Sequence, residues 1–190
     1  MSRVDPIFTH IFTSSLAMLI RCTAKLLREM GLGKVDPHAG ASPPESELGE
    51  WYANLFYIER RKCVIFSNAP TLFSIISFDV RRPEIRDLAD LFRKGLERAL
   101  RDERFSDEAI RRVLGETGEI RFDRTADRSV LGVMVDHVKT AQYLAWYDGG
   151  LGKCDRVDIA KRLNRTPLAK KDFFNSIEEF SRVLGECKDK

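Results

Sequence analysis

The residues best suited to chemistry in this 190-residue chain are basic and form two short groups. Arg60, Arg61 and Lys62 separate two apolar runs, so we expect them at the tip of a hairpin. Arg128 and Ser129 stand at the predicted start of a long helix, where backbone N–H groups attract negative charge. Guanidinium groups bind phosphate oxygens through paired hydrogen bonds. If the two groups converge, they form a site for a phosphate or a nucleic-acid backbone; otherwise the tip is a solvated turn paired with surface carboxylates.

Three aspartates offer a different chemistry. Asp123, Asp127 and Asp136 could hold a divalent cation for phosphoryl transfer, since hard cations prefer oxygen ligands. Their spacing matches no known motif, and Asp127, with Thr125 as the alternative, can instead cap the helix that follows. They give the alternative hypothesis of a metal-assisted phosphoesterase or nuclease.

The histidines and cysteines lack the spacing of metal or catalytic sites. His10, His38 and His137 are isolated from one another and from cysteine, which argues against zinc. Cys63 alternates toward the inside of its predicted strand, so an activated thiol is not expected there. The chain contains no GxGxxG, GxxxxGK[ST], GxSxG or HExxH signature. We therefore expect no metal and no cofactor, and we favour a binding module over an enzyme.

Aromatic residues suggest one more binding mode. A set of five aromatics could form a base-stacking platform on an open sheet: Trp51, Tyr52, Phe56, Phe66 and Phe73. Their two-sided pattern favours core packing instead.

Composition is that of an ordinary globular protein. Hydrophobic residues make up 43% and charged residues 32%, and the net charge of +3 comes from interleaved opposite charges that do not by themselves imply nucleic acid. No apolar run reaches the roughly 20 residues of a membrane span, so we expect no membrane partner. We predict a poorly ordered extension over residues 1–17, with a docked helix or a targeting segment as the alternatives. A single domain is predicted over 18–185 with a flexible loop at 33–49, followed by a tail over 186–190.

The predicted domain is organised around residues 51–78. Apolar and aromatic residues there form three runs with short connections, which predicts an antiparallel meander covered on both faces. The connection at Arg60–Arg61 lacks glycine or asparagine, so we expect it to be longer than two residues.

Other segments have clear helical or strand periods. Further strands are predicted over 18–22, 119–125 and 156–163, the last with helix as a nearly equal alternative. Helices are predicted after Thr23, from Pro83 to Ala99, after Ser106, through Tyr147, and after Asn175. The expected fold is α+β: a mainly antiparallel sheet of about five strands, with the 51–78 meander central, covered by four or five helices.

Three segments carry a family resemblance: LGEWYANLFYIERRKCVIFSNAPTLFS, RSVLG at 128–132 and LNRTPL at 163–168. In this order they resemble a family of small bacterial proteins known only as a domain of unknown function. The likeness runs from about Met18 to Leu184. It implies a cytoplasmic α+β protein, leaves the first 17 residues outside the shared region, and supplies no catalytic residues.

The leading functional hypothesis is a non-catalytic intracellular binding or regulatory module for an anionic ligand. The alternatives are the metal-assisted enzyme and a protein–protein adaptor or homo-oligomer. Exposure of Trp51 or Trp146 would favour the last of these.

Overall fold

The structure is a computed structural model that describes residues 17–33, 46–168 and 175–186. These residues form a five-stranded sheet: β1 (Ala17–Cys22), β2 (Trp51–Ile58), β3 (Arg61–Asn68), β4 (Ser74–Ser77) and β5 (Glu119–Arg124). They also form seven helices: α1 (Ala24–Met30), α2 (Arg82–Arg86), α3 (Leu88–Asp102), α4 (Asp107–Gly115), α5 (Arg128–Tyr147), α6 (Arg156–Arg165) and α7 (Ser176–Val183). The predicted extension over 1–17, loop over 33–49 and tail over 186–190 lie largely outside the described residues.

The sheet is mixed, with strand order β4-β3-β2-β1-β5. The predicted meander is confirmed, because β3 pairs antiparallel with both β2 and β4. Its predicted central position is wrong, because the meander forms one side of the sheet and β4 is an edge strand. The prediction of a mainly antiparallel sheet is wrong, because β1 pairs parallel with both β2 and β5. Parallel neighbours need a long crossover connection, and the segment between β1 and β2, which contains α1, provides one. The alternation of side chains along a strand does not report the direction of its neighbour.

The turn between β2 and β3 is shorter than predicted. Glu59 and Arg60 alone connect the strands, and both have positive φ, 48° and 66°. That left-handed conformation costs roughly 1–2 kcal/mol for a residue with a side chain. A tertiary contact offsets part of this cost, since Glu59 Oε2 accepts a hydrogen bond from the Leu151 backbone N–H at 3.1 Å. Gly150, with φ at 109°, leaves room for the carboxylate, because a Cβ there would lie 2.4 Å from Glu59 Oε1.

The helix predicted from Pro83 is divided in two. Asp87 ends α2 and caps α3, accepting a hydrogen bond from the Asp90 backbone N–H at 3.2 Å. Helix capping was predicted correctly at Ser106, which accepts from the Ala109 N–H at 3.1 Å.

Residues 156–163, predicted as a strand with helix nearly as favoured, belong to α6. Asp155 begins this helix, because its carboxylate accepts hydrogen bonds from the backbone N–H groups of Val157 (2.9 Å) and Asp158 (3.1 Å). With α6 and the division between α2 and α3, the described residues form seven helices rather than the four or five predicted.

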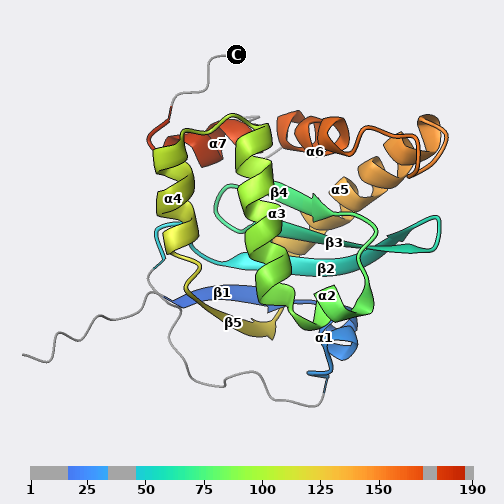
Figure 1. Cartoon of the computed structure of the whole chain (residues 1–190), viewed down its shortest axis with the longest axis horizontal. Helices are drawn as coiled ribbons and strands as arrows, with labels where there is room; N and C mark the ends of the chain where they lie inside the picture. Colours follow the sequence, from blue (N-terminus) through green and yellow to red (C-terminus); the bar gives the residue numbers. More distant parts are fainter. Residues whose placement is uncertain (1–16, 34–45, 169–174, 187–190) are drawn as a thin grey trace, which may run out of the picture.

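Helices cover both faces of the sheet, so the fold has three layers (Figure 1). Helices α1, α2, α3, α4 and α7 pack on one face, and α5 and α6 pack on the other. Trp51 is fully buried in the first layer, with its ring 5.0 Å from that of Phe92 and 6.2 Å from that of Phe180. The single α+β domain predicted from the sequence is confirmed, with a mixed sheet.

The β2–β3 turn generates a stability prediction. Arg60→Gly should raise the free energy of unfolding by about 0.5–1 kcal/mol, because glycine adopts the left-handed conformation without strain. Glu59→Gly relieves the same strain but removes the carboxylate bound to Leu151, so it should give no gain. Urea denaturation of both variants measures the difference. Destabilisation by Arg60→Gly would contradict this account of the turn.

Candidate functional site

The basic tip predicted from the sequence is largely paired. Arg61 lies 3.2 Å from Asp79 in an exposed ion pair. Lys62 forms an ion pair with Glu29 on α1, which lowers the pKa of that carboxyl group. Two of the three charges are thus engaged by carboxylates, as in the solvated-turn alternative.

The second basic group lies at the opposite end of β2. The hydroxyl of Tyr52, near the start of β2, accepts a hydrogen bond from the Asp127 N–H at 3.1 Å. Near the end of β2, the Tyr57 carbonyl accepts one from the Gln142 side chain at 2.8 Å. The helix rise between Arg128 and Gln142 is about 21 Å, so the structure does not bring Arg128 and the tip together.

Ser129 is also engaged. Its backbone N–H donates to Asp127 Oδ1 at 2.6 Å, so the capping carboxylate occupies the start of α5. The same bond confirms the predicted cap.

The carboxylates of the metal hypothesis have separate partners. Asp123 lies 3.1 Å from Arg21, which also binds Glu50 at 2.6 Å, and Asp136 lies 3.5 Å from Lys139. Within residues 17–33, 46–168 and 175–186, no group of three or more His, Cys, Asp or Glu side chains could hold a metal ion.

The five aromatic residues of the stacking hypothesis are all buried, at 0–5% exposure: Trp51, Tyr52, Phe56, Phe66 and Phe73. The interpretation of these five residues as core residues is therefore confirmed. Cys63 is also buried, and burial raises the pKa of its thiol, which disfavours the nucleophilic thiolate.

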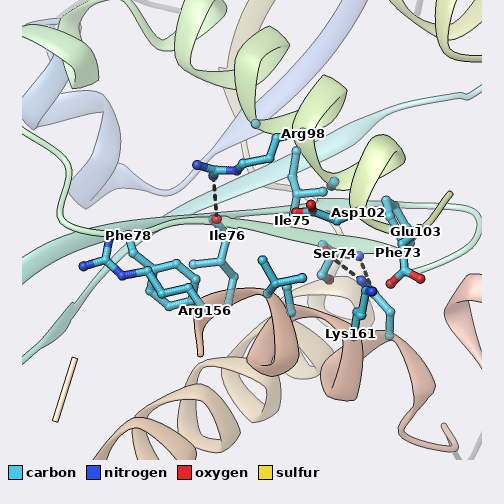
Figure 2. A pocket seen from close by; sticks show the side chains of 15 residues that line it. Phe73, Ser74, Ile75, Ile76, Phe78, Arg98, Asp102, Glu103, Arg156 and Lys161 are labelled. Atoms are coloured by element: carbon cyan, nitrogen blue, oxygen red, sulfur yellow. Dashed lines mark hydrogen bonds between the residues drawn. The ribbon is translucent and has the colours of Figure 1, made fainter. Parts of the chain in front are cut away.

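A pocket lies where the outer edge of β4 meets α3 and α6 (Figure 2). Its volume is about 230 Å³. Apolar walls come from Ile75, Ile76 and Phe78 on one side and from Val157 and Ala160 on the other. The pocket thus joins an edge strand to two helices from opposite faces of the sheet.

One amide side chain takes the place of a further strand at this edge. Asn164 Oδ1 accepts from the Ser74 N–H at 2.7 Å, and Asn164 Nδ2 donates to the Ser74 carbonyl at 2.8 Å. The Ser176 hydroxyl at the start of α7 donates to the Asn164 carbonyl at 3.1 Å. Asn164 therefore joins α6, α7 and β4 through buried hydrogen bonds.

Ile76 is the next residue of β4 whose backbone groups point away from β3, and it lines the pocket. Asn68 donates to the Phe73 carbonyl, so hydrogen bonding to β3 alternates from Phe73 onward, and Ile76 directs its N–H and carbonyl away from β3. Arg98 from α3 donates to the Ile76 carbonyl at 3.4 Å, as Figure 2 shows. A backbone N–H and a guanidinium group thus lie next to each other at the pocket rim.

Positive charge predominates around the pocket. Its lining includes Arg98, Arg156 and Lys161 together with Asp102 and Glu103. Glu103 is already compensated by Arg165, which binds its two carboxylate oxygens at 2.8 and 2.6 Å. The Arg156 guanidinium lies 6.0 Å from the centre of the Phe78 ring, against an apolar wall. An anionic group would therefore meet more cations than carboxylates.

A buried polar chain lies behind the pocket. Ser74 Oγ is 2.7 Å from Ser67 Oγ and 3.0 Å from His137 Nδ1. His137 is 3% exposed, and its Nε2 has no hydrogen-bond partner in the described part of the chain. Burial lowers the pKa of His137 to about 4, so the ring is neutral at pH 7. A solvent-excluded serine and imidazole form a structural link between β3, β4 and α5.

Sequence reasoning missed the pocket residues for two reasons. Arg98 lies in the helix predicted from Pro83 to Ala99, where interleaved opposite charges indicate a solvated surface. Lys161 lies in segment 156–163, and Asn164 directly follows it. If this segment were a strand, the two side chains would not lie on the same face. A helix places them on one face, because the pocket residues of this segment recur at i, i+3, i+4 and i+7: Val157, Ala160, Lys161 and Asn164. A helix assignment would have revealed the shared face.

The fold and pocket define a single-domain α+β protein with a partly cationic cavity at the free edge of a mixed sheet. The chain belongs to the family described as a domain of unknown function (DUF6933), which matches residues 19–179. The resemblance seen in the sequence is thereby confirmed. No curated protein and no solved structure matches the chain. Among the described helices, none has both the length and the apolar character required to cross a membrane.

Asn164 provides a second stability prediction. Asn164→Leu leaves the N–H and carbonyl of Ser74 buried without partners, which should cost about 2–5 kcal/mol of unfolding free energy. Asn175→Leu is the matched control, because among the described residues the Asn175 side chain bonds the partly buried Glu178 alone, at 3.2 Å. It should cost less than about 1 kcal/mol. Equal losses in the two variants, measured by urea denaturation, would contradict the proposed role of Asn164.

His137 makes stability depend on pH. Its pKa is about 4 in the folded protein, below the roughly 6.5 of an unfolded chain, so the unfolded state binds the proton more tightly. The resulting stability is present above pH 6.5 and is lost as pH falls toward 4. Compared with His137→Asn, the native protein should lose about 2–3 kcal/mol more between pH 7 and pH 4. Parallel pH profiles from denaturant titrations would rule this out.

Proposed function

We propose that this protein is a non-catalytic binding module for a small anionic ligand with an apolar body, held in the pocket at the outer edge of β4. The observation that carries the proposal is the pairing at Ile76. Its outward N–H and the Arg98 guanidinium lie side by side at the rim of an apolar cavity. A carboxylate or phosphate can accept hydrogen bonds from both donors.

The rest of the pocket supports the same ligand class. Arg156 and Lys161 add positive charge from α6, on the wall opposite Arg98. Apolar side chains line the interior, where an uncharged ligand body loses contact with water. A volume of about 230 Å³ lies below the roughly 300–1,000 Å³ of typical ligand pockets, so the ligand is small.

This proposal keeps the anionic ligand predicted from the sequence and changes the residues that bind it. Arg60, Arg61, Lys62 and Arg128 are not at the pocket. Arg61 and Lys62 already have carboxylate partners, whereas Arg98, Arg156 and Lys161 form no ion pair with a described residue. Cations without a carboxylate partner attract an anionic ligand more strongly than cations that are already paired.

Three probes separate the contributions of charge and apolar surface. Hexanoate carries both, hexanol lacks the charge, and inorganic phosphate lacks the apolar body. Hexanoate should raise the melting temperature and shift the NMR signal of the Ile76 amide, whereas the other two should do so much less. An Ile76 signal that hexanoate leaves unchanged would contradict the proposed contact.

Substitutions test which arginines matter. Arg98→Gln should weaken hexanoate binding about tenfold or more, since a charged hydrogen bond is lost. Arg111→Gln, on the exposed face of α4, is the matched control and should leave affinity unchanged. Arg60→Gln and Arg128→Gln test the sites predicted from the sequence. If these two lower affinity and Arg98→Gln does not, the proposal is wrong; calorimetric titration measures all four.

A further inference from the structure

The outward face of α5 carries three exposed aromatic residues. Tyr143, Trp146 and Tyr147 are 58%, 73% and 72% exposed, whereas Trp51, the other tryptophan, is fully buried. The ring of Tyr143 lies 6.1 Å from that of Trp146 and 6.2 Å from that of Tyr147, so the three form one surface. Figure 1 shows α5 crossing behind the sheet, with its C-terminal end reaching past the strands at the upper right.

The same face of α5 is different in its N-terminal half. Gly132, Val135 and Lys139 precede Tyr143 and Trp146 at helical spacing, and all five are exposed. This half offers small, aliphatic and cationic groups, whereas the C-terminal half offers aromatic rings. The two halves are complementary, because rings pack on aliphatic surface and attract ammonium groups.

Nothing in the described part of the chain requires glycine at position 132. A Cβ placed there meets no atom within 4 Å, and the residue has no positive φ. Glycine in a helix interior is nevertheless less favourable than alanine. A position that tolerates a side chain but lacks one suits the close approach of another surface.

We propose that α5 pairs antiparallel with α5 of a second copy of this chain about a two-fold axis. The axis lies between the two halves, so Trp146 and Tyr147 of each copy cover Gly132 and Val135 of the other. Lys139 of each copy then lies against Tyr143 of the other. Every contact occurs twice, as an isologous interface requires.

The buried area is consistent with a reversible dimer. An aromatic side chain buries about 150–250 Å² when fully covered, so the exposed parts of these three supply roughly 300–500 Å² per subunit. With the facing N-terminal halves included, the total approaches the roughly 1,000 Å² of a weak specific interface. The interface also presents both charge signs, Asp136 and Lys139, on each subunit.

Sedimentation velocity of the full chain between about 1 µM and about 200 µM tests the proposal. The native protein should pass from monomer to dimer over this range. The emission of Trp146 should shift to shorter wavelength as the dimer forms, and buried Trp51 leaves that shift attributable to Trp146.

Three variants test whether the exposed face of α5 forms the dimer interface. Trp146→Ala should abolish the dimer, and Gly132→Leu should weaken it at least tenfold while keeping or raising the melting temperature of the dilute monomer. Val183→Ala removes exposed apolar surface on α7 and should change neither property. A monomer at every concentration, or a dimer that survives both α5 substitutions, overturns the proposal. A monomer whose Trp146 is already shielded also overturns it and indicates that another segment of the same chain covers α5.

Discussion

The arrangement around the pocket depends on the hydrogen bonds between Asn164 and Ser74. A sheet edge must be paired, covered or exposed to water, and here a side-chain amide pairs with one backbone position in place of a strand. That contact fixes α6 against β4, and the Ser176 hydroxyl brings α7 to the same point. On β4 the Asn164 amide pairs with Ser74 and does not reach Ile76, so the outward amide of Ile76 faces the pocket.

The basic residues of the pocket differ from several other basic residues of the protein, which are paired with carboxylates. Arg21 binds two carboxylates, which raises its pKa, and Arg165 binds both oxygens of buried Glu103. These pairs join segments that are distant in the sequence, and their mutual compensation leaves little attraction for a ligand. Arg98 instead donates to a neutral carbonyl, so its charge is free to meet an anion. The proposed anion site therefore uses the charge that no described carboxylate compensates.

Helix α5 contributes to the core and to the surface through different residues. Val130, Met134 and Ala141 pack on the sheet, and His137 joins the polar chain behind β4. The opposite face carries the aromatic surface proposed to pair with a second copy. None of the residues on that face lines the pocket. The proposed ligand site and the proposed dimer interface thus rest on separate residues, and either proposal can fail without the other.

The sequence determined local features: the 51–78 meander, the caps at Ser106 and Asp127, and the long helix through Tyr147. These follow from residues a few positions apart, whose period and hydrogen-bonding groups act locally. Tertiary structure decided the parallel pairing of β1, the two-residue turn at Glu59 and Arg60, and the pocket. Each depends on contacts between distant segments, as when Asn164 meets Ser74, 90 residues away. Local periodicity records which residues are buried but does not record which other segment buries them.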